Sequence, residues 1–205
     1  MIAIIDYGVG NLFSLKSSLA MIGAQAIVTG DADVLRSADR LILPGVGAFG
    51  DARQKLAQTG LDAALCAEAA RGKPVLGICL GMQMLFDRSL EYGEHKGLGL
   101  IPGEVVPMAG RLPEGLKIPH IGWNALHILD EANPIFRYTT HGECVYFVHS
   151  FYAAGCDESY IATAEYGREI TAAVNRDNLF GCQFHPEKSG AAGLSILRAF
   201  CEIKG

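Results

Sequence analysis

The sequence predicts an α/β protein with a central, mostly parallel sheet, helices on both faces of that sheet, and an antiparallel β extension. In the first half of the 205-residue chain, short continuous apolar runs alternate with helix-like segments, which is typical of a buried parallel sheet. The second half consists mostly of strand-like runs separated by turns. Half of the residues are hydrophobic and the length suits one domain, so we expect a single domain over residues 1–205.

The first half supplies the parallel strands and the helices between them. Continuous apolar runs predict buried strands at residues 2–6, 26–29, 40–44 and 74–78. Leucines at helical spacing predict a helix that Asn11 caps and Gly23 ends. An Ala-rich helix is expected over residues 51–71 with a break at Gly60, and a further helix begins at Leu80 and continues through Phe86.

The second half supplies the antiparallel extension and closes with a helix. Strand-like runs separated by turn residues are expected at residues 98–108, 120–129, 144–152, 160–166, 170–174 and 179–185. Apolar positions at helical spacing predict the closing helix over residues 189–203.

Composition excludes several classes of partner. The net charge of −5, without a cluster of lysine and arginine, argues against a nucleic-acid-binding protein. No apolar run reaches the ~18 residues that a membrane helix needs, and the N-terminal segment reads as a strand rather than a signal peptide. The six cysteines form no C-x-x-C pair, so we expect free thiols in a reducing cytoplasm, with no metal and no cofactor.

Cys79 is the first candidate for a chemical role. It is the centre of Gly77-Ile78-Cys79-Leu80-Gly81, a G-x-C-x-G motif between a predicted strand and a predicted helix. In that geometry a tight turn lifts a nucleophile clear of the sheet, the helix N-terminus stabilises a thiolate, and the backbone N–H of Leu80 faces the same space. The motif is short, and taken alone it equally suits a structural glycine turn with a buried cysteine.

His185 and Glu187 are the candidate base and its orienting partner. His185 ends an apolar strand, and Glu187 follows two residues later, so an extended backbone would place both side chains on one side. A thiolate nucleophile needs a base, and the base needs a group that holds its other nitrogen. His-x-Glu is common by itself, but with Cys79 it forms a plausible catalytic set.

The glycine-rich stretch from Leu43 to Gly50 is the third candidate. Gly45 and Gly47 permit unusual backbone angles, which lets peptide N–H groups face a ligand. This stretch also follows a predicted parallel strand, so it can lie beside the turn at Cys79. In isolation it is equally consistent with an ordinary loop.

Together these motifs resemble the class I, or triad-type, glutamine amidotransferases. The stretches "GICLGMQ", "PGVGAF" and "QFHPEKSG" stand where that family has its nucleophile turn, oxyanion strand and His-x-Glu end. Within it, "IDYGVGNLFS", "KIPHIGWN", "YFVHSFY" and "NLFGCQFHPEKSG" are similar to the glutaminase subunits of imidazole glycerol phosphate synthase. This resemblance extends over nearly the whole chain.

The resemblance implies a role for each matching residue. Cys79 would attack the side-chain amide of glutamine, His185 would protonate the departing ammonia and then activate water, and Glu187 would orient His185. Glutamine and the oxyanion would be held by the side chain or backbone of Val46, Gly47, Leu80, Gln83, Ser150 and Phe151. His149 is more simply a structural histidine than a second base, and Cys182 is most simply a packing residue.

The resemblance also implies a second protein. The amidotransferase pattern uses the chain from residue 2 to residue 203, so the acceptor of the ammonia is expected on a (β/α)₈ cyclase subunit, forming a heterodimer. That subunit would make imidazole glycerol phosphate and an aminoimidazole carboxamide ribotide in histidine biosynthesis. The docking face would include Asn11, Trp123, Asn124, Tyr146 and Lys188, and docking would reorganise the loop at Val46.

Three alternatives remain open at this stage. The chain could be the glutaminase subunit of another pathway, such as anthranilate or pyridoxal phosphate synthesis, although "PHIGWN" argues against it. It could be a cysteine peptidase or related hydrolase on a similar sheet, which would cleave peptides. A catalytically silent binding module is the third, and the intact set of Cys79, His185 and Glu187 argues against it.

Overall fold

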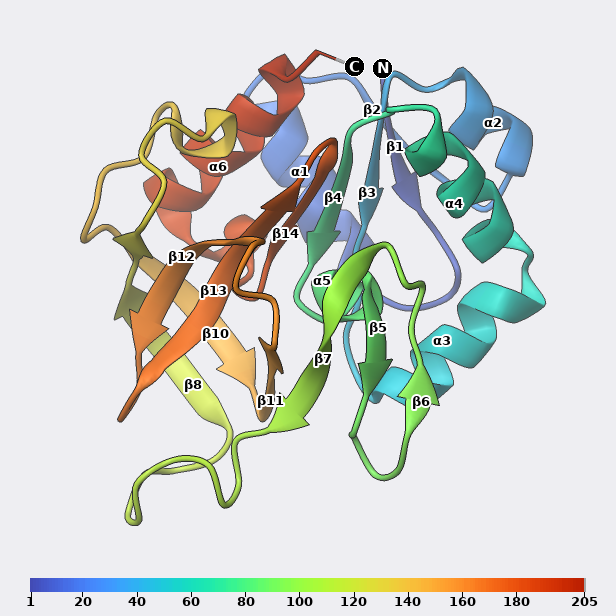
Figure 1. The fold of residues 1–205 in the computed structure, drawn as a ribbon. Helices are drawn as coiled ribbons and strands as arrows, with labels where there is room; N and C mark the ends of the chain where they lie inside the picture. The colour runs from blue at the N-terminus through green and yellow to red at the C-terminus, as the bar shows by residue number, and fades with distance from the viewer. Residues whose placement is uncertain (205) are drawn as a thin grey trace.

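Eight strands form the central sheet of the computed structural model, which describes residues 1–204 (Figure 1). Their order is β2-β1-β3-β4-β14-β13-β12-β9. The five strands at one side are parallel: β2 (Ala26–Thr29), β1 (Ile2–Ile5), β3 (Arg40–Leu43), β4 (Val75–Ile78) and β14 (Leu179–Cys182). The other three continue the sheet antiparallel: β13 (Glu169–Arg176), β12 (Tyr160–Glu165) and β9 (His127–Ile128). This confirms the mostly parallel sheet with an antiparallel extension.

Helices cover both faces of the sheet, as predicted. Helices α1 (Leu12–Met21) and α6 (Gly190–Glu202) cover one face, and α2 (Ala32–Ser37), α3 (Phe49–Gln58) and α4 (Leu61–Ala70) lie on the other side of Figure 1. The short helix α5 (Leu80–Met84) follows the carboxyl end of β4. The predicted break at Gly60 is confirmed, because its φ of 71° is left-handed and separates α3 from α4.

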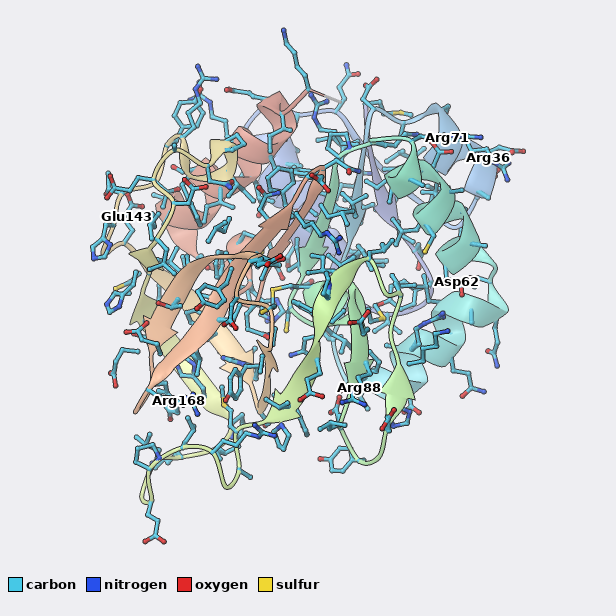
Figure 2. All side chains as sticks on the ribbon, in the orientation of Figure 1. Arg36, Asp62, Arg71, Arg88, Glu143 and Arg168 are labelled. Atoms are coloured by element: carbon cyan, nitrogen blue, oxygen red, sulfur yellow. The ribbon has the colours of Figure 1, made fainter. Side chains whose placement is uncertain are left out.

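Two apolar cores result from the alternation of side chains along each strand. In β1, Ile2 and Ile4 enter the core under α1 and α6, whereas Ala3 and Ile5 enter the core under α2 to α4. Each fully buried Leu or Ile contributes roughly 1.5–3 kcal/mol relative to an exposed one, so the continuous apolar runs drive formation of this sheet. Figure 2 shows labelled charged side chains such as Arg36, Arg88 and Glu143 at the outside of the molecule.

Two smaller sheets complete the fold beside the central one. The four-stranded sheet has the order β11-β7-β5-β6, with β11 (Phe151–Ala154), β7 (Ile101–Pro107), β5 (Phe86–Ser89) and β6 (His95–Lys96). An antiparallel ribbon pairs β8 (His120–Ala125) with β10 (Cys144–His149). Two 3₁₀ turns, η1 (Pro134–Phe136) and η2 (Pro186–Lys188), connect neighbouring elements.

The predicted helix from Leu80 through Phe86 is too long. Helix α5 ends at Met84, and the chain continues as strand β5 from Phe86. The carbonyls that a longer helix would use are taken by a distant segment: Leu98 N–H donates to Met84 O at 2.8 Å and Ile101 N–H to Leu85 O at 3.0 Å. Tertiary pairing therefore overrides the local helical pattern.

Other elements differ from the prediction in smaller ways. Helix α2 and strand β6 were not predicted at all. Two predicted strands are each split, at Leu126 between β8 and β9 and at Ser150 between β10 and β11, because their two parts join different sheets. Asn11 occupies the N-cap position of α1, but its ψ of 65° is not extended and its side chain makes no capping hydrogen bond. Within residues 1–204, none of the helices is long and apolar enough to cross a bilayer.

Candidate active site

Cys79 stands on a strained turn between β4 and α5. Its φ of 52° and ψ of −111° are rare for a residue with a side chain, and backbone strain of this kind concentrates at functional sites. The Cys79 N–H donates to Cys182 O at 2.7 Å, and Cys79 O accepts from Gln83 N–H at 3.1 Å. The turn is therefore held by the neighbouring strand β14 on one side and by α5 on the other.

The glycines around Cys79 are required by close backbone packing. A Cβ at Gly81 would lie 1.8 Å from the carbonyl oxygen of Leu43, and one at Gly77 would lie 2.7 Å from the backbone of Met82. A Cβ at Gly45 would lie 2.8 Å from the Gly81 nitrogen and 2.9 Å from Leu80 Cβ. The glycine-rich loop after β3 is thus packed against the turn that carries Cys79, which is the arrangement that the sequence predicted.

His185 and Glu187 form a buried hydrogen-bonded pair. The Nδ1 atom of His185 lies 2.9 Å from Oε1 of Glu187, and both side chains are only 3% exposed. Burial by itself lowers the pKa of His185, but the Cys79 sulfur and the Glu187 carboxylate outweigh burial and raise this pKa to about 9. Cys79 and His185 also line the same cavity. The imidazole therefore interacts with Cys79 and Glu187 together.

The backbone that carries His185 and Glu187 differs from the extended conformation that the sequence predicted for both residues. Only His185 is extended, with φ −99° and ψ 97°, whereas Glu187 lies in the 3₁₀ turn η2 that begins at Pro186. The His185 N–H donates to Tyr146 O at 2.9 Å, and Ser189 Oγ donates to His185 O at 2.6 Å. A proline tolerates the first position of such a turn, so Pro186 starts η2 and brings the carboxylate back onto the imidazole.

A cavity of about 300 Å³ opens over Cys79, and every residue of the predicted substrate site lines it. Its lining includes all six predicted positions, Val46, Gly47, Leu80, Gln83, Ser150 and Phe151. Val46 is 41% exposed, and the φ of Gly47 is 89°, so this part of the loop is free to present peptide groups to a ligand. The size suits one small molecule.

Gln83 and Gln183 form a buried amide pair next to the thiol. Gln83 Nε2 donates to Gln183 Oε1 at 2.9 Å and to Phe151 O at 3.1 Å. Gln183 Nε2 in turn donates to Cys79 Sγ at 3.7 Å, so the amide pair contacts the sulfur directly. The sequence interpretation missed Gln183, although a glutamine inside the apolar run "LFGCQFH" was a usable signal.

Glu91 and Tyr92 also line the cavity and were not predicted. Glu91 is 9% exposed, and its Oε2 accepts the N–H of Phe49 at 2.8 Å, at the beginning of α3. Burial raises the pKa of the Glu91 carboxyl. Tyr92 is 88% exposed and has a positive φ of 52°, and its ring packs edge-on against Phe151. No local motif in the sequence marked either residue.

His149 is a structural histidine at the cavity wall. Its Nδ1 lies 2.8 Å from Phe151 O, and its Nε2 lies 3.0 Å from His120 Nδ1. Burial lowers the pKa of His149 to about 3, so the ring is neutral at physiological pH and donates to Phe151 O. It thereby orients the Ser150–Phe151 segment and has no hydrogen bond to Cys79.

The predicted docking residues separate into two groups. One group lies on the β8–β10 ribbon and the adjacent turn η2, and consists of Trp123, Tyr146 and Lys188. The rings of Trp123 and Tyr146 meet edge-on, and Lys188 Nζ lies 5.9 Å from the centre of the Tyr146 ring. Trp123 is 56% exposed, so it is not a core residue. The amide of Asn124 is turned inward and donates to Glu165 O at 2.7 Å. Asn11 lies at the start of α1.

Comparisons with known proteins agree with this geometry. The family model described as Glutamine amidotransferase class-I matches residues 3–203. Two curated relatives are both named imidazole glycerol phosphate synthase subunit HisH. The one from Caldanaerobacter subterraneus subsp. tengcongensis is 48% identical over 204 residues, which cover 99% of this chain and 98% of the relative. The one from Methanothermobacter thermautotrophicus is 50% identical over 203 residues, with coverage of 99% and 98%.

Solved structures are similar in fold. The PurLQS structure from Thermotoga maritima has a TM-score of 0.75 at 22% identity, over 97% of this chain and 96% of that chain. A crystal structure described as glutamine amidotransferase has a TM-score of 0.76 at 18% identity, over 98% and 97%. At these identities the two structures show the fold alone.

Proposed function

The chain belongs to the class I glutamine amidotransferase family, and from that premise we propose that its Cys79 site hydrolyses L-glutamine to glutamate and ammonia. The chain is the glutaminase subunit of an imidazole glycerol phosphate synthase, an enzyme of histidine biosynthesis. The single observation that carries the proposed site is the convergence of Cys79, His185 and the predicted substrate residues on one cavity.

In the proposed first half-reaction, Cys79 acts as the nucleophile. Its thiolate attacks the side-chain carbonyl carbon of glutamine, and His185 delivers a proton to the amide nitrogen as the C–N bond breaks. Ammonia leaves, and a glutamyl thioester remains on the sulfur. The raised pKa of His185 supports this role, because the protonated imidazole has a proton to donate.

In the second half-reaction, His185 acts as a base toward water. It takes a proton from the water molecule that attacks the thioester, and glutamate and the free thiol result. The Glu187 carboxylate holds Nδ1 of His185, so that Nε2 is the atom available for proton transfer. The oxyanion of each tetrahedral intermediate is assigned to backbone N–H groups at Val46, Gly47 and Leu80, which surround the same cavity.

The α-amino acid end of glutamine needs its own recognition groups. We assign the α-ammonium to the carboxylate of Glu91, an anionic side chain that lines the cavity. Backbone groups at Ser150 and Phe151 are assigned to the same end of the substrate, and Gln83 to its side chain. A charge-assisted contact of this kind discriminates glutamine from a neutral amide by roughly 1.5–3 kcal/mol.

The chain acts as one subunit with a partner. We propose that this partner is a (β/α)₈ cyclase that receives the ammonia, with docking through Trp123, Tyr146 and Lys188 on the ribbon and through Asn11 and Asn124. The exposure of Trp123 supports this face, because large exposed aromatic side chains are typical interface anchors. The cytoplasm is the proposed location, since the catalytic thiol must stay reduced.

Replacement of the nucleophile tests the proposed site. With the cyclase subunit and its nucleotide substrate present, Cys79→Ala is expected to lower glutamate formation by at least about 10³-fold. Synthesis supported by added ammonium salt is expected to continue. The matched control Cys66→Ala, at a half-buried thiol on α4, is expected to keep wild-type turnover. Undiminished glutamine hydrolysis by folded Cys79→Ala would refute the assignment.

Dependence on the partner is tested by the same assay without it. Flanking glycines make a rearrangement of the Val46 peptide inexpensive, so docking is expected to organise the oxyanion donors. Glutamate formation is therefore expected to rise strongly when the cyclase subunit and its nucleotide are added. Equal turnover under all conditions would exclude this coupling.

A further inference from the structure

One oxygen of the Glu187 carboxylate has no partner. Oε1 binds the His185 imidazole, but Oε2 is buried and accepts no hydrogen bond from any group in residues 1–204. The side chain is only 3% exposed. A buried carboxylate oxygen without a partner is unfavourable, and native structures rarely leave such atoms unsatisfied. The oxygen therefore needs a hydrogen-bond donor that residues 1–204 do not supply.

A cavity of about 10 Å³ lies next to this carboxylate. Glu187 lines it together with Leu15, Ile78 and the loop residues Pro44 and Gly45. A volume on the order of 10–15 Å³ holds one molecule of the size of water. Ammonia is that size, whereas glutamine and glutamate are far too large. The cavity is separate from the 300 Å³ substrate cavity, although the two share part of their walls.

Asn11 supplies a second polar side chain at the small cavity. It lines the cavity, and it does not use its amide to cap α1, although it occupies the N-cap position. An amide group can accept and donate hydrogen bonds at once. Asn11 and the unpartnered Glu187 oxygen thus line the same cavity, which offers both side chains to one small hydrogen-bonding guest.

The position of the cavity suits a product of the Cys79 reaction. Val46 and His185 line both the substrate cavity and the small cavity. In the proposed reaction His185 is the residue from which the departing nitrogen takes its proton, and Val46 belongs to the glycine-rich loop after β3. Asn11, which lines only the small cavity, is one of the residues that the family resemblance implies for the docking face. The small cavity therefore shares walls with the site that releases ammonia and includes a residue of the expected docking face.

We propose that this cavity, between Glu187 Oε2 and Asn11, is a holding site for the ammonia released at Cys79. The inference rests on the proposed glutaminase function and adds a binding site to it. When the C–N bond of the tetrahedral intermediate breaks, the nitrogen leaves as NH₃ with the proton from His185, and the C–S bond remains. NH₃ offers three N–H donors, which match the oxygens of Glu187 and Asn11.

Anomalous diffraction tests the site directly. Thallous ion, Tl⁺, has nearly the size and charge of ammonium, the form that ammonia takes once it is protonated beside the Glu187 carboxylate, and it scatters anomalously. Crystals of the complex with the cyclase subunit are therefore soaked in thallous acetate. The expected result is a peak in contact with Glu187 Oε2, which fades when ammonium acetate is added as a competitor. No peak in this cavity at saturating Tl⁺ would overturn the proposal.

Filling the cavity tests its role in ammonia transfer. Leu15→Met places a longer, unbranched apolar side chain at the cavity wall, and Leu15→Phe adds side-chain volume there. The readout is the ratio of cyclase product to glutamate formed in the complete synthase. We expect this ratio to fall at least about two-fold in Leu15→Met and further in Leu15→Phe, with free ammonia released into solution.

The matched control is Leu19→Met, on the same helix and fully buried but away from the cavity. Its ratio is expected to remain at the wild-type value of one product per glutamate. A ratio of one in both Leu15 variants would overturn the holding site. A failure of the glutaminase function itself would look different, because no glutamate would then form in any of these proteins.

Discussion

Two neighbouring cysteines of this chain differ sharply in their surroundings. Cys182 lies beside Cys79 on the adjacent strand, is fully buried, and has a pKa that burial raises well above its usual value. Cys79 has the strained turn, lines the 300 Å³ cavity proposed to bind substrate and interacts with His185. The prediction that Cys182 is a packing residue is consistent with this burial. Backbone geometry and cavity access, rather than the presence of sulfur, distinguish the two thiols.

Glu91→Gln tests substrate recognition at the residue scale. The variant keeps an oxygen that can accept the Phe49 N–H but loses the negative charge. We expect the KM for glutamine to rise about 10-fold or more, because a charge-assisted contact to the α-ammonium is lost, with a smaller change in kcat. Steady-state kinetics of the synthase measure both constants.

The matched control for that variant is Glu94→Gln, in the same β5–β6 loop. Glu94 is exposed and contacts only Arg88 among the ion pairs of residues 1–204. Its KM is expected to stay within about two-fold of wild type, since exposed pairs contribute little. An unchanged KM in Glu91→Gln would remove Glu91 from the substrate site.

The raised pKa of His185 predicts a pH dependence of stability. A histidine whose pKa rises from 6.5 to about 9 on folding stabilises the fold fully below pH 6.5. This contribution is lost as the pH rises from 6.5 through about 9. Because Glu187 is one cause of the shift, Glu187→Gln should lower the pKa of His185 and weaken the loss over this window.

Two measurements check the His185 prediction. An NMR titration of the imidazole gives its pKa in wild type and in Glu187→Gln, and urea unfolding between pH 6 and 10 gives the stability. We expect the wild-type unfolding free energy to fall by up to about 3 kcal/mol over this window, and that of the variant by less, because the Cys79 sulfur still raises the pKa of His185 there. An identical His185 titration in the two proteins would contradict the assigned cause.

At the scale of elements, stability depends on the contact between the loop that follows β3 and the turn that follows β4. Gly81→Ala would place a Cβ 1.8 Å from the Leu43 carbonyl, and neither backbone can move without disturbing the sheet. We expect a loss of stability of about 2–3 kcal/mol or more, measured by urea unfolding. Glutaminase activity should fall as well, because α5 and Cys79 shift together.

Gly50→Ala in α3 is the control for that substitution. Its added Cβ would meet only the ring of His95, a side chain that can turn away. Alanine also favours the helix, so a change within about 1 kcal/mol is expected. Equal stability of Gly81→Ala and wild type would mean that the two turns are not packed as described.

At the scale of the whole molecule, the β8–β10 ribbon carries the expected docking surface. Trp123→Ala is expected to weaken binding of the cyclase subunit by roughly 2 kcal/mol, about 30-fold in Kd. The reason is that an exposed tryptophan that becomes buried on binding is a frequent interface anchor. Basal hydrolysis by the isolated subunit should stay unchanged, since Trp123 is absent from the wall of the substrate cavity. Isothermal titration calorimetry measures the affinity.

The control for the docking prediction is Met21→Ala. Met21 is 76% exposed and is the last residue of α1, which is not part of the ribbon. Like Trp123→Ala, its truncation removes exposed apolar surface. Its affinity for the cyclase subunit is expected to match wild type. Equal affinity of Trp123→Ala and wild type would place the interface on another face.

The sequence by itself determined the features that depend on local pattern. Continuous apolar runs of four residues predict the strands around Ile4 and Leu76, because buried parallel strands are short and apolar on both faces. Helical spacing predicts α1 and α6. The catalytic candidates were equally accessible, since a nucleophile turn and a His-x-Glu end are short motifs with their own chemistry. The structure contains these strands and helices as predicted.

Only the tertiary structure decided the features that depend on partners distant in the chain. The segment around Leu98 captures the carbonyls after Met84, which turns a predicted helix into strand β5. The β5–β6 loop then carries Glu91 to the substrate cavity, and the pairing of β14 with β4 brings Gln183 to Cys79. Such contacts join residues 14 to 104 positions apart, and no local periodicity encodes them.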